Sequence, residues 1–256
     1  MPERTGVWLY AVTRSRSGWD DLAGVAGAPV RPIESGGLVA LGSTVDLASF
    51  GEDALKRNLE DLGWLAATAR AHDHVVRAAS SRGVAVPLRL ATVYLDDDRV
   101  RAMLDTRGAD FAAALRQFDG RAEWGVKGYA EPAAEPEAAP ATARSGTDYL
   151  RRRRTQLAAR HASGERAAED AAGIHEALTS FAVAARTHPP QSPTLSGTSA
   201  PMVLNATYLV ENAHTAEFGQ LVTEQDECRP GIRLELTGPW PPYSFAHDDI
   251  AEVGRS

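Results

Sequence analysis

VAVPLRLATVYL, residues 84–95, opens the stretch that decides the fold, which continues to Tyr129. Its apolar and polar side chains alternate, as in a half-buried strand whose successive side chains point to opposite faces. Asp96–Asp98 follow and can cap a helix, apolar residues at helical spacing come next, and Gly120 is typical of a helix end. RAEWGVKGY, residues 121–129, returns to alternation. The stretch predicts a strand, a helix and a second strand.

A second pattern of this kind lies near the C-terminus. MVLNATYLV at 202–210 and GIRLELTG at 231–238 alternate as strands, and the segment 213–227 between them is an amphipathic helix. A long helical stretch precedes each pattern. Two related units of this kind predict an α+β protein of two domains rather than one large sheet.

The composition is that of a globular protein, with 43% hydrophobic and 24% charged residues among 256. The net charge of −7 argues against nucleic-acid binding, because an acidic chain lacks the cationic surface that binds phosphates. The single cysteine, Cys228, cannot form an internal disulfide, which fits a reducing cytosol. No targeting signal and no apolar window of about 20 residues is visible, so we expect a soluble cytoplasmic protein without a membrane span.

The N-terminal half contains further strand and helix signals. Gly6–Val12 is an apolar run typical of a central strand, and Gly36–Val45 predicts a second strand. Ser49 and Glu52 form a capping-box pattern, which predicts one helix from Ser49 to Ser80. Pro87 cannot donate to a ladder and therefore marks an edge, a bulge or a strand start.

Two groups of polar residues allow a functional or a structural interpretation. His72 lies on the apolar stripe of the predicted helix, between Asp73 and His74. Because His72 and His74 are two residues apart they face different sides, which favours a hydrogen-bonded core histidine over a shared metal or acid/base cluster. Asp96–Asp98 could bind a divalent metal, but no further ligand follows at EF-hand spacing, and a helix cap explains all three.

Alanine, proline and glutamate without periodicity fill residues 130–144 and predict a semi-rigid linker. A long helix is expected from Asp148 to about Thr187, with a thin apolar face that leaves parts of it exposed or paired with another molecule. These features predict an N-terminal domain at 1–130, a linker at 131–144, a C-terminal domain at 145–246 and a polar tail at 247–256.

The basic run consists of Arg151, Arg152, Arg153 and Arg154, within the predicted long helix. As a nucleic-acid site it is weak, because no aromatic residues interleave with it and the chain around it is acidic. The remaining interpretations are a solvated helix face with acidic neighbours and a contact for a protein partner.

The usual motifs of catalysis and cofactor binding are missing. The chain has no GxxxxGK[ST] or GxGxxG phosphate loop, no GxSxG elbow and no zinc-ligand spacing. We therefore expect no catalytic residue, no cofactor and no metal. Catalytic groups can still converge from distant segments, so an enzyme remains a competing hypothesis.

LTGPWPPYSF, residues 236–245, resembles the C-terminal hallmark of the gas vesicle GvpL/GvpF family. Other stretches resemble the same family and extend the likeness over most of the chain outside the two proline-rich loops: Val7–Val12, Leu59–Leu65 with Ala71–Asp73, Pro87–Tyr94, Glu123–Lys127 and Leu204–Val210. The family often has phenylalanine or glycine where this chain has Leu90 and Ala91.

The resemblance implies a two-domain fold, with an N-terminal ferredoxin-like α/β sandwich and a modified ferredoxin-like α+β domain that carries a long helix. It also implies a non-enzymatic accessory or minor structural protein of gas vesicles in the cytoplasm. Its expected partners are the major shell protein GvpA, whose aggregation it would limit during nucleation, and other accessory proteins. Apart from the resemblance, the thin apolar face of the helix Asp148–Thr187 and its basic run Arg151–Arg154 make these two the candidates for the contact.

The competing hypothesis is a small-molecule-binding or flavin-binding module, or an enzyme, with His72, Asp73 and Arg89 as its site. An RNA-binding domain is disfavoured, because the chain has only two lysines. Trp240, Tyr243 and Phe245 allow two interpretations, an apolar grip on a partner or a loop locked onto the core, and the second is favoured.

Overall fold

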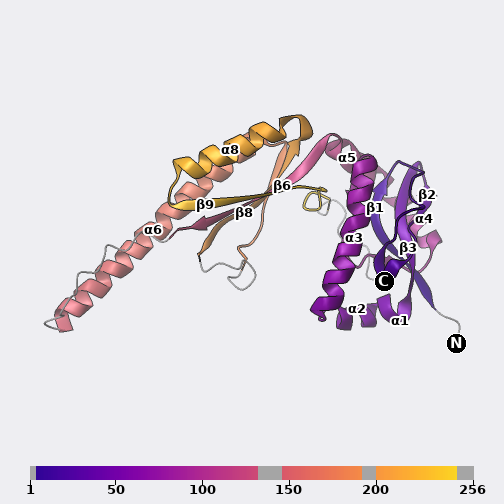
Figure 1. The fold of residues 1–256 in the computed structure, drawn as a ribbon, viewed down its shortest axis with the longest axis horizontal. Helices are drawn as coiled ribbons and strands as arrows, with labels where there is room; N and C mark the ends of the chain where they lie inside the picture. The colour runs from indigo at the N-terminus through magenta and orange to yellow at the C-terminus, as the bar shows by residue number, and fades with distance from the viewer. Residues whose placement is uncertain (1–3, 132–145, 192–199, 247–256) are drawn as a thin grey trace. The chain divides into compact units, whose positions relative to one another are not determined.

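The chain folds into two compact units in the computed structural model, which describes residues 4–131, 146–191 and 200–246 (Figure 1). The first unit comprises Met1–Glu123 and Pro239–Ser256, and the second comprises Trp124–Gly238. This division differs from the predicted domains in two places, because the strand at 121–130 opens the second unit and the C-terminal segment belongs to the first. The predicted linker and tail fall almost entirely outside the described residues.

The sheet of the first unit has the strand order β2-β3-β1-β4, and β5 also pairs with β1. The pairs β1–β3, β1–β4, β1–β5 and β2–β3 are all antiparallel. Its strands are β1 (Thr5–Thr13), β2 (Arg31–Ser35), β3 (Leu38–Asp46), β4 (Ala85–Pro87) and β5 (Val93–Tyr94). Eight of the nine β1 residues are buried, as expected for the central apolar run. Gly36 and Gly37 both have positive φ in the two-residue β2–β3 turn, and β2 itself was missed by the sequence patterns.

The strand predicted at 84–95 is interrupted. Only β4 and β5 form, and both pair with β1. Pro87 ends β4, which lies at the sheet edge as its proline predicted. Ala91 has φ 65°, which no strand residue adopts, so the segment between β4 and β5 turns away from the sheet. Alternation of side chains cannot reveal such a turn.

The helices of the first unit are shorter than predicted. They are η1 (Val25–Gly27), α1 (Leu47–Phe50), α2 (Glu52–Asn58), α3 (Leu62–Arg82), α4 (Asp97–Thr106) and α5 (Gly108–Phe118). The single helix expected from Ser49 to Ser80 is wrong, because three helices cover this range and Ser49 lies inside the first. Asp46 caps α1 and Asp61 caps α3. The cap predicted for Asp96 is confirmed, since its carboxylate accepts from Arg99 N over 2.8 Å.

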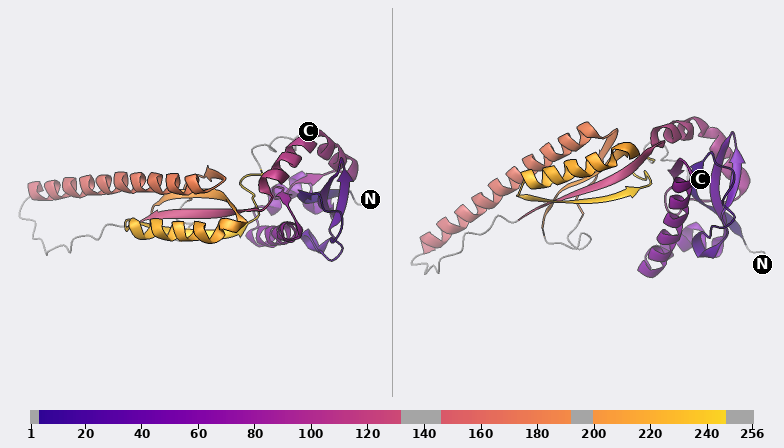
Figure 2. Two further views of the ribbon diagram at one scale, coloured as in Figure 1. Left: turned by 90° about the horizontal axis from the view of Figure 1, so that it is seen from above. Right: turned by 45° about the horizontal axis from the view of Figure 1, so that its top comes forward.

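The sheet of the second unit has the order β7-β8-β6-β9. Its elements are β6 (Arg121–Ala130), α6 (Gly146–Phe181), β7 (Ala184–Thr187), β8 (Met202–Glu211), η2 (Asn212–His214), α8 (Thr215–Cys228) and β9 (Ile232–Trp240). Figures 1 and 2 show α6 and α8 side by side on one face of this sheet. The two helices and the strands share one hydrophobic core, to which the helices contribute Ile174, Leu178, Phe218 and Val222. β7 replaces the last turns of the predicted long helix, which ends at Phe181.

Both sheets therefore have the same order, in which the second, third, first and fourth strands of each unit are neighbours. The predicted repeat, which aligned residues 84–129 with 202–238, is wrong, because β4 is the fourth strand of its unit whereas β8 is the third strand of its own. Residues 84–95 supply the last strands of the first sheet, whereas β6 is the first strand of the second. Alternation along a strand identifies the strand and one buried face, and it says nothing about which sheet the strand joins.

Candidate functional site

His72 lies in the core of the first unit, on the face of α3 that packs against β1. Trp8 Nε1 donates to His72 Nδ1 over 3.1 Å, and His72 Nε2 donates to the Leu88 carbonyl over 3.1 Å. A carbonyl can only accept, so the ring carries its proton on Nε2. Burial lowers the pKa of His72 from 6.5 to about 4. The predicted core histidine is confirmed, because both ring nitrogens are engaged and the ring is neutral.

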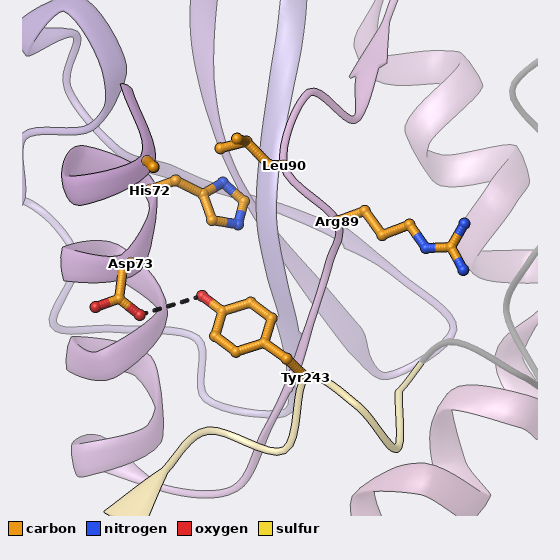
Figure 3. A pocket seen from close by; sticks show the side chains of 6 residues that line it. His72, Asp73, Arg89, Leu90 and Tyr243 are labelled. Carbon is orange, nitrogen blue, oxygen red and sulfur yellow. Dashed lines mark hydrogen bonds between the residues drawn. The ribbon is translucent and has the colours of Figure 1, made fainter. Parts of the chain in front are cut away.

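A hollow of about 340 Å³ opens beside this histidine (Figure 3). Its lining residues come from α3, from the segment between β4 and β5 and from the C-terminal segment: Ala69, His72, Asp73, Arg89, Leu90 and Tyr243. The fold thus brings together the three residues of the competing hypothesis, His72, Asp73 and Arg89. In Figure 3 the Arg89 side chain extends away from the rings of His72 and Tyr243.

Asp73 has two partners within the first unit. Its carboxylate forms an ion pair with Arg77 Nε over 2.5 Å and accepts from the Tyr243 hydroxyl over 3.4 Å. Burial, together with the negative charge of Asp73, raises the pKa of Tyr243, so this hydroxyl stays protonated and can donate. Asp73 therefore holds the C-terminal segment in place. Its carboxylate is engaged by Arg77 and Tyr243, which argues against a role as a general base.

The Arg89 backbone is held in a tight turn. Its carbonyl accepts from Thr92 N over 3.3 Å and from Thr92 Oγ1 over 2.7 Å, with Ala91 between them at positive φ. This conformation suits glycine better than alanine. The turn leaves Arg89 exposed at the rim of the hollow, where its charge faces solvent.

The C-terminal segment, residues 239–246, is locked onto the first unit. Glu123 accepts from both Ser244 N and Ser244 Oγ over 2.7 Å, and Phe245 is buried. The Arg77 guanidinium lies 4.5 Å from the centre of the Trp240 ring. Locking of the loop is thus the interpretation that the contacts support. Sequence reasoning missed Glu123 and Ser244, since a glutamate in a strand gives no sign that its carboxylate is buried.

Arg151–Arg154 lie on α6, in the part before Ala167, which is the first buried residue among those whose burial is described. We call residues 146–166 the arm. None of its described side chains is buried, and Leu157 is 57% exposed. Figures 1 and 2 show the arm continuing beyond α8 and the strands of its own unit. Arg151, Arg153 and Arg154 are exposed, and the side chain of Arg152 lies outside the described part.

The acidic run before α4 is occupied by protein contacts. Asp96 caps the helix, Asp97 pairs with Arg31 over 2.7 Å, and Asp98 pairs with Arg101 over 2.7 Å. The Arg31 hydrogen bond lowers the pKa of Asp97. Among the described residues no group of three or more His, Cys, Asp or Glu is placed to hold a metal ion. In the same part of the chain, no helix combines the length and apolarity of a membrane span.

Comparison with known proteins places these features in a family. The family described as gas vesicle synthesis protein GvpL/GvpF matches residues 6–247. Gas vesicle protein L of Streptomyces sp. (strain CB03234) is 46% identical, with 96% of each chain covered. Gas vesicle protein F of the same strain is 26% identical, with 93% of this chain and 98% of that protein covered. The chain is thus more similar to the L protein of that strain than to its F protein.

The fold agrees with a solved structure. The crystal structure of the gas vesicle protein GvpF from Anabaena sp. PCC7120 superposes with a TM-score of 0.69 at 20% identity, covering 98% of this chain and 99% of that one. The match of the family over nearly the whole chain, together with the 46% identical relative, establishes that this chain belongs to the gas vesicle GvpL/GvpF family.

Proposed function

We propose that this protein is an assembly factor of gas vesicles that binds the major shell protein GvpA and limits its aggregation during nucleation. The supporting observation is the family match over residues 6–247, combined with an exposed helical arm that its own unit leaves uncovered. In this proposal both units are ferredoxin-like variants, the first with η1 in place of a crossover helix. The protein acts in the cytoplasm, in association with vesicles, and makes or breaks no covalent bond.

The need for such a factor follows from the physics of a gas-filled shell. A shell subunit whose inner surface must repel water exposes that apolar surface before assembly, and exposed apolar patches aggregate. A soluble partner that covers the patch lowers the concentration of free subunits whose apolar surface is exposed. It can release them at a growing shell, where contacts between subunits replace its own.

The arm is the contact we assign to the shell protein. The helical face that buries Ala167, Ala171 and Ile174 further along α6 continues into the arm through Arg153 and Leu157, at multiples of about 3.6 residues. In the arm this face offers the exposed Leu157 beside arginines. It suits an amphipathic helix of the partner, with the arginines setting orientation more than affinity.

A binding assay with purified shell protein tests this contact. We expect R151A/R152A/R153A/R154A to retain less shell protein than the wild type. The matched control is R57A/R70A/R99A/R116A, which removes four exposed arginines of the first unit and should bind normally. Equal binding by all three proteins would refute the arm as the contact.

The hollow beside His72 supports a second candidate, a small-molecule or flavin module. Its lining joins aromatic and apolar walls to an exposed arginine at the rim. Native mass spectrometry and the visible spectrum of the purified protein test it. A bound mass or colour that R89A loses would favour this candidate.

A further inference from the structure

Two helices of the second unit carry charges of opposite sign. The arm contains six arginines and two acidic residues, a net charge of +4. α8 contains four acidic residues and neither lysine nor arginine: Glu217, Glu224, Asp226 and Glu227. The whole chain has a net charge of −7, so the arm is a basic element of an acidic protein.

Exposed helices elsewhere in the chain mix the two signs and pair them within one turn. Lys56 pairs with Glu52 over 2.8 Å in α2, and Arg77 pairs with Asp73 over 2.5 Å in α3. Arg101 pairs with Asp98 over 2.7 Å in α4. Such pairs are the usual way in which a solvated helix face balances its charges. The arm has one such contact, between His161 and Glu165 over 3.3 Å, but arginines predominate on it, and α8 carries acidic charges without a lysine or arginine.

The side chains concerned are exposed. Arg153 and Arg154 on the arm, and Glu217, Glu224 and Glu227 on α8, form no ion pair with any residue that the structure describes. Asp226 differs, because it accepts from Leu234 N over 2.6 Å. At 3.6 residues per turn the three glutamates fall within an arc of about 80°. They therefore form one acidic stripe on the outer face of α8.

Arg153 and Arg154 cannot reach the acidic stripe of their own molecule. Phe181 at the end of α6 contacts Phe218, and Arg229 just after α8 lies 3.8 Å from Asp170 of α6. α8 thus runs along the last third of α6 and ends near Asp170. Arg154 is 16 residues before Asp170, which at 1.5 Å per residue is about 24 Å along the helix axis. Within the described part of the same molecule, Arg153 and Arg154 therefore have no acidic partner, and a second molecule can supply one.

We propose that the arm of one copy docks along the acidic stripe of α8 in a second copy. The surfaces are opposite in charge, and the arm, about 31 Å long, is long enough to cover the stripe from Glu217 to Glu227, which extends for about 15 Å. Leu157 supplies an apolar contact between the arginines. Two copies that exchange arms form both contacts at once, in a closed pair.

This association is weak and depends on salt, because it consists of exposed charges. It also covers the surface that the proposed function gives to the shell protein, so the two uses of the arm compete. The inference does not rest on the proposed function, since it concerns the protein alone.

Sedimentation velocity across a concentration series tests it, at about 30 mM and about 500 mM NaCl, which differ several-fold in Debye length. The wild type should shift towards a dimer at low salt, and the shift should disappear at high salt. R153E/R154E and E224R/E227R should each be monomeric, since the first lowers the net charge of the arm from +4 to 0 and the second raises that of α8 from −4 to 0.

Mixing the two variants is the decisive step of the experiment. The carboxylates that R153E/R154E introduces should pair with the guanidinium groups that E224R/E227R introduces and restore the dimer. R70E/R116E, which makes the same charge change at exposed residues of the first unit, should behave like the wild type. A monomeric wild type at low salt, or a mixture that stays monomeric, would overturn the proposal. Retained shell-protein binding by E224R/E227R would separate this contact from the proposed function.

Discussion

At the scale of single residues, the first unit holds its polar side chains in fixed pairs. His72 bridges Trp8 and the Leu88 carbonyl, and Glu123 bridges both donors of Ser244. A buried polar group is stable only when its hydrogen bonds are made, so each pair fixes the position of two distant segments. Free energies of unfolding therefore test these pairs.

His72 makes stability depend on pH. Its pKa is about 4 in the folded protein and about 6.5 in the unfolded chain, so the unfolded state binds more protons between these values. Stability from this residue is complete above pH 6.5, declines as the pH falls, and changes no further below about 4. We expect a loss of about 3 kcal/mol over this window.

Urea unfolding at pH 7 and pH 4.5 measures this effect. His72→Asn, whose amide oxygen can still accept from Trp8, should show a smaller pH-dependent loss than the wild type. His74→Asn, at an exposed neighbouring position, should keep the full loss. A wild-type loss equal to that of the His72 variant would contradict the neutral buried histidine.

Ser244→Ala should lower the free energy of unfolding of the first unit by about 1–3 kcal/mol. The substitution removes the charge-assisted hydrogen bond from the Ser244 hydroxyl to the buried Glu123 carboxylate. Tryptophan fluorescence during urea unfolding gives the value. Ser81→Ala, which removes an exposed hydroxyl that bonds only the Ala78 carbonyl, is the control and should cost much less. Equal effects would mean that the Glu123 contact does not hold the segment.

The sequence indicated the His72 environment because a histidine on an apolar helical stripe must be buried and bonded. It could not indicate Glu123–Ser244, since the partners are 121 residues apart and each is ordinary in its local pattern. It did place His72, Asp73 and Arg89 in one candidate site. It could not show that the Tyr243 hydroxyl would donate a hydrogen bond to the Asp73 carboxylate.

At the scale of helices and strands, local signals predicted where regular structure occurs better than where it ends. The apolar runs of β1, β3, β8 and β9 were identified because a buried strand requires them. The long helix from Ser49 was misread, because an apolar spacing continues across the two breaks between α1, α2 and α3. Pairing between distant strands is likewise invisible to local patterns, which is why β6 was assigned to the wrong sheet.

The misread helix start leads to a direct comparison of two caps. Asp61→Ala should destabilise the first unit by about 1 kcal/mol, because its carboxylate accepts from the amides of Gly63 and Trp64 over 2.8 and 3.1 Å. Ser49→Ala should have little effect, since Ser49 lies within α1. Thermal unfolding of both variants measures the two losses of stability. A larger loss in the Ser49 variant would contradict the cap at Asp61 and favour the predicted capping box.

At the scale of the whole molecule, the family and the exposed arm lead to one account. Two related units provide stable scaffolds, and the second presents a helix of which only the last third is covered by its own unit. The residues that the fold leaves uncovered are basic, in a chain that is otherwise acidic. The sequence indicated this element through its thin apolar face, but it could not indicate which part would be covered.

The most direct test is the soluble yield of the shell protein GvpA when it is expressed with this protein. The account predicts that coexpression raises the soluble fraction several-fold over expression alone, and that R151A/R152A/R153A/R154A gives much less of this gain than R57A/R70A/R99A/R116A. A soluble fraction that is the same with and without this protein would contradict the central claim that it shields the shell subunit before assembly.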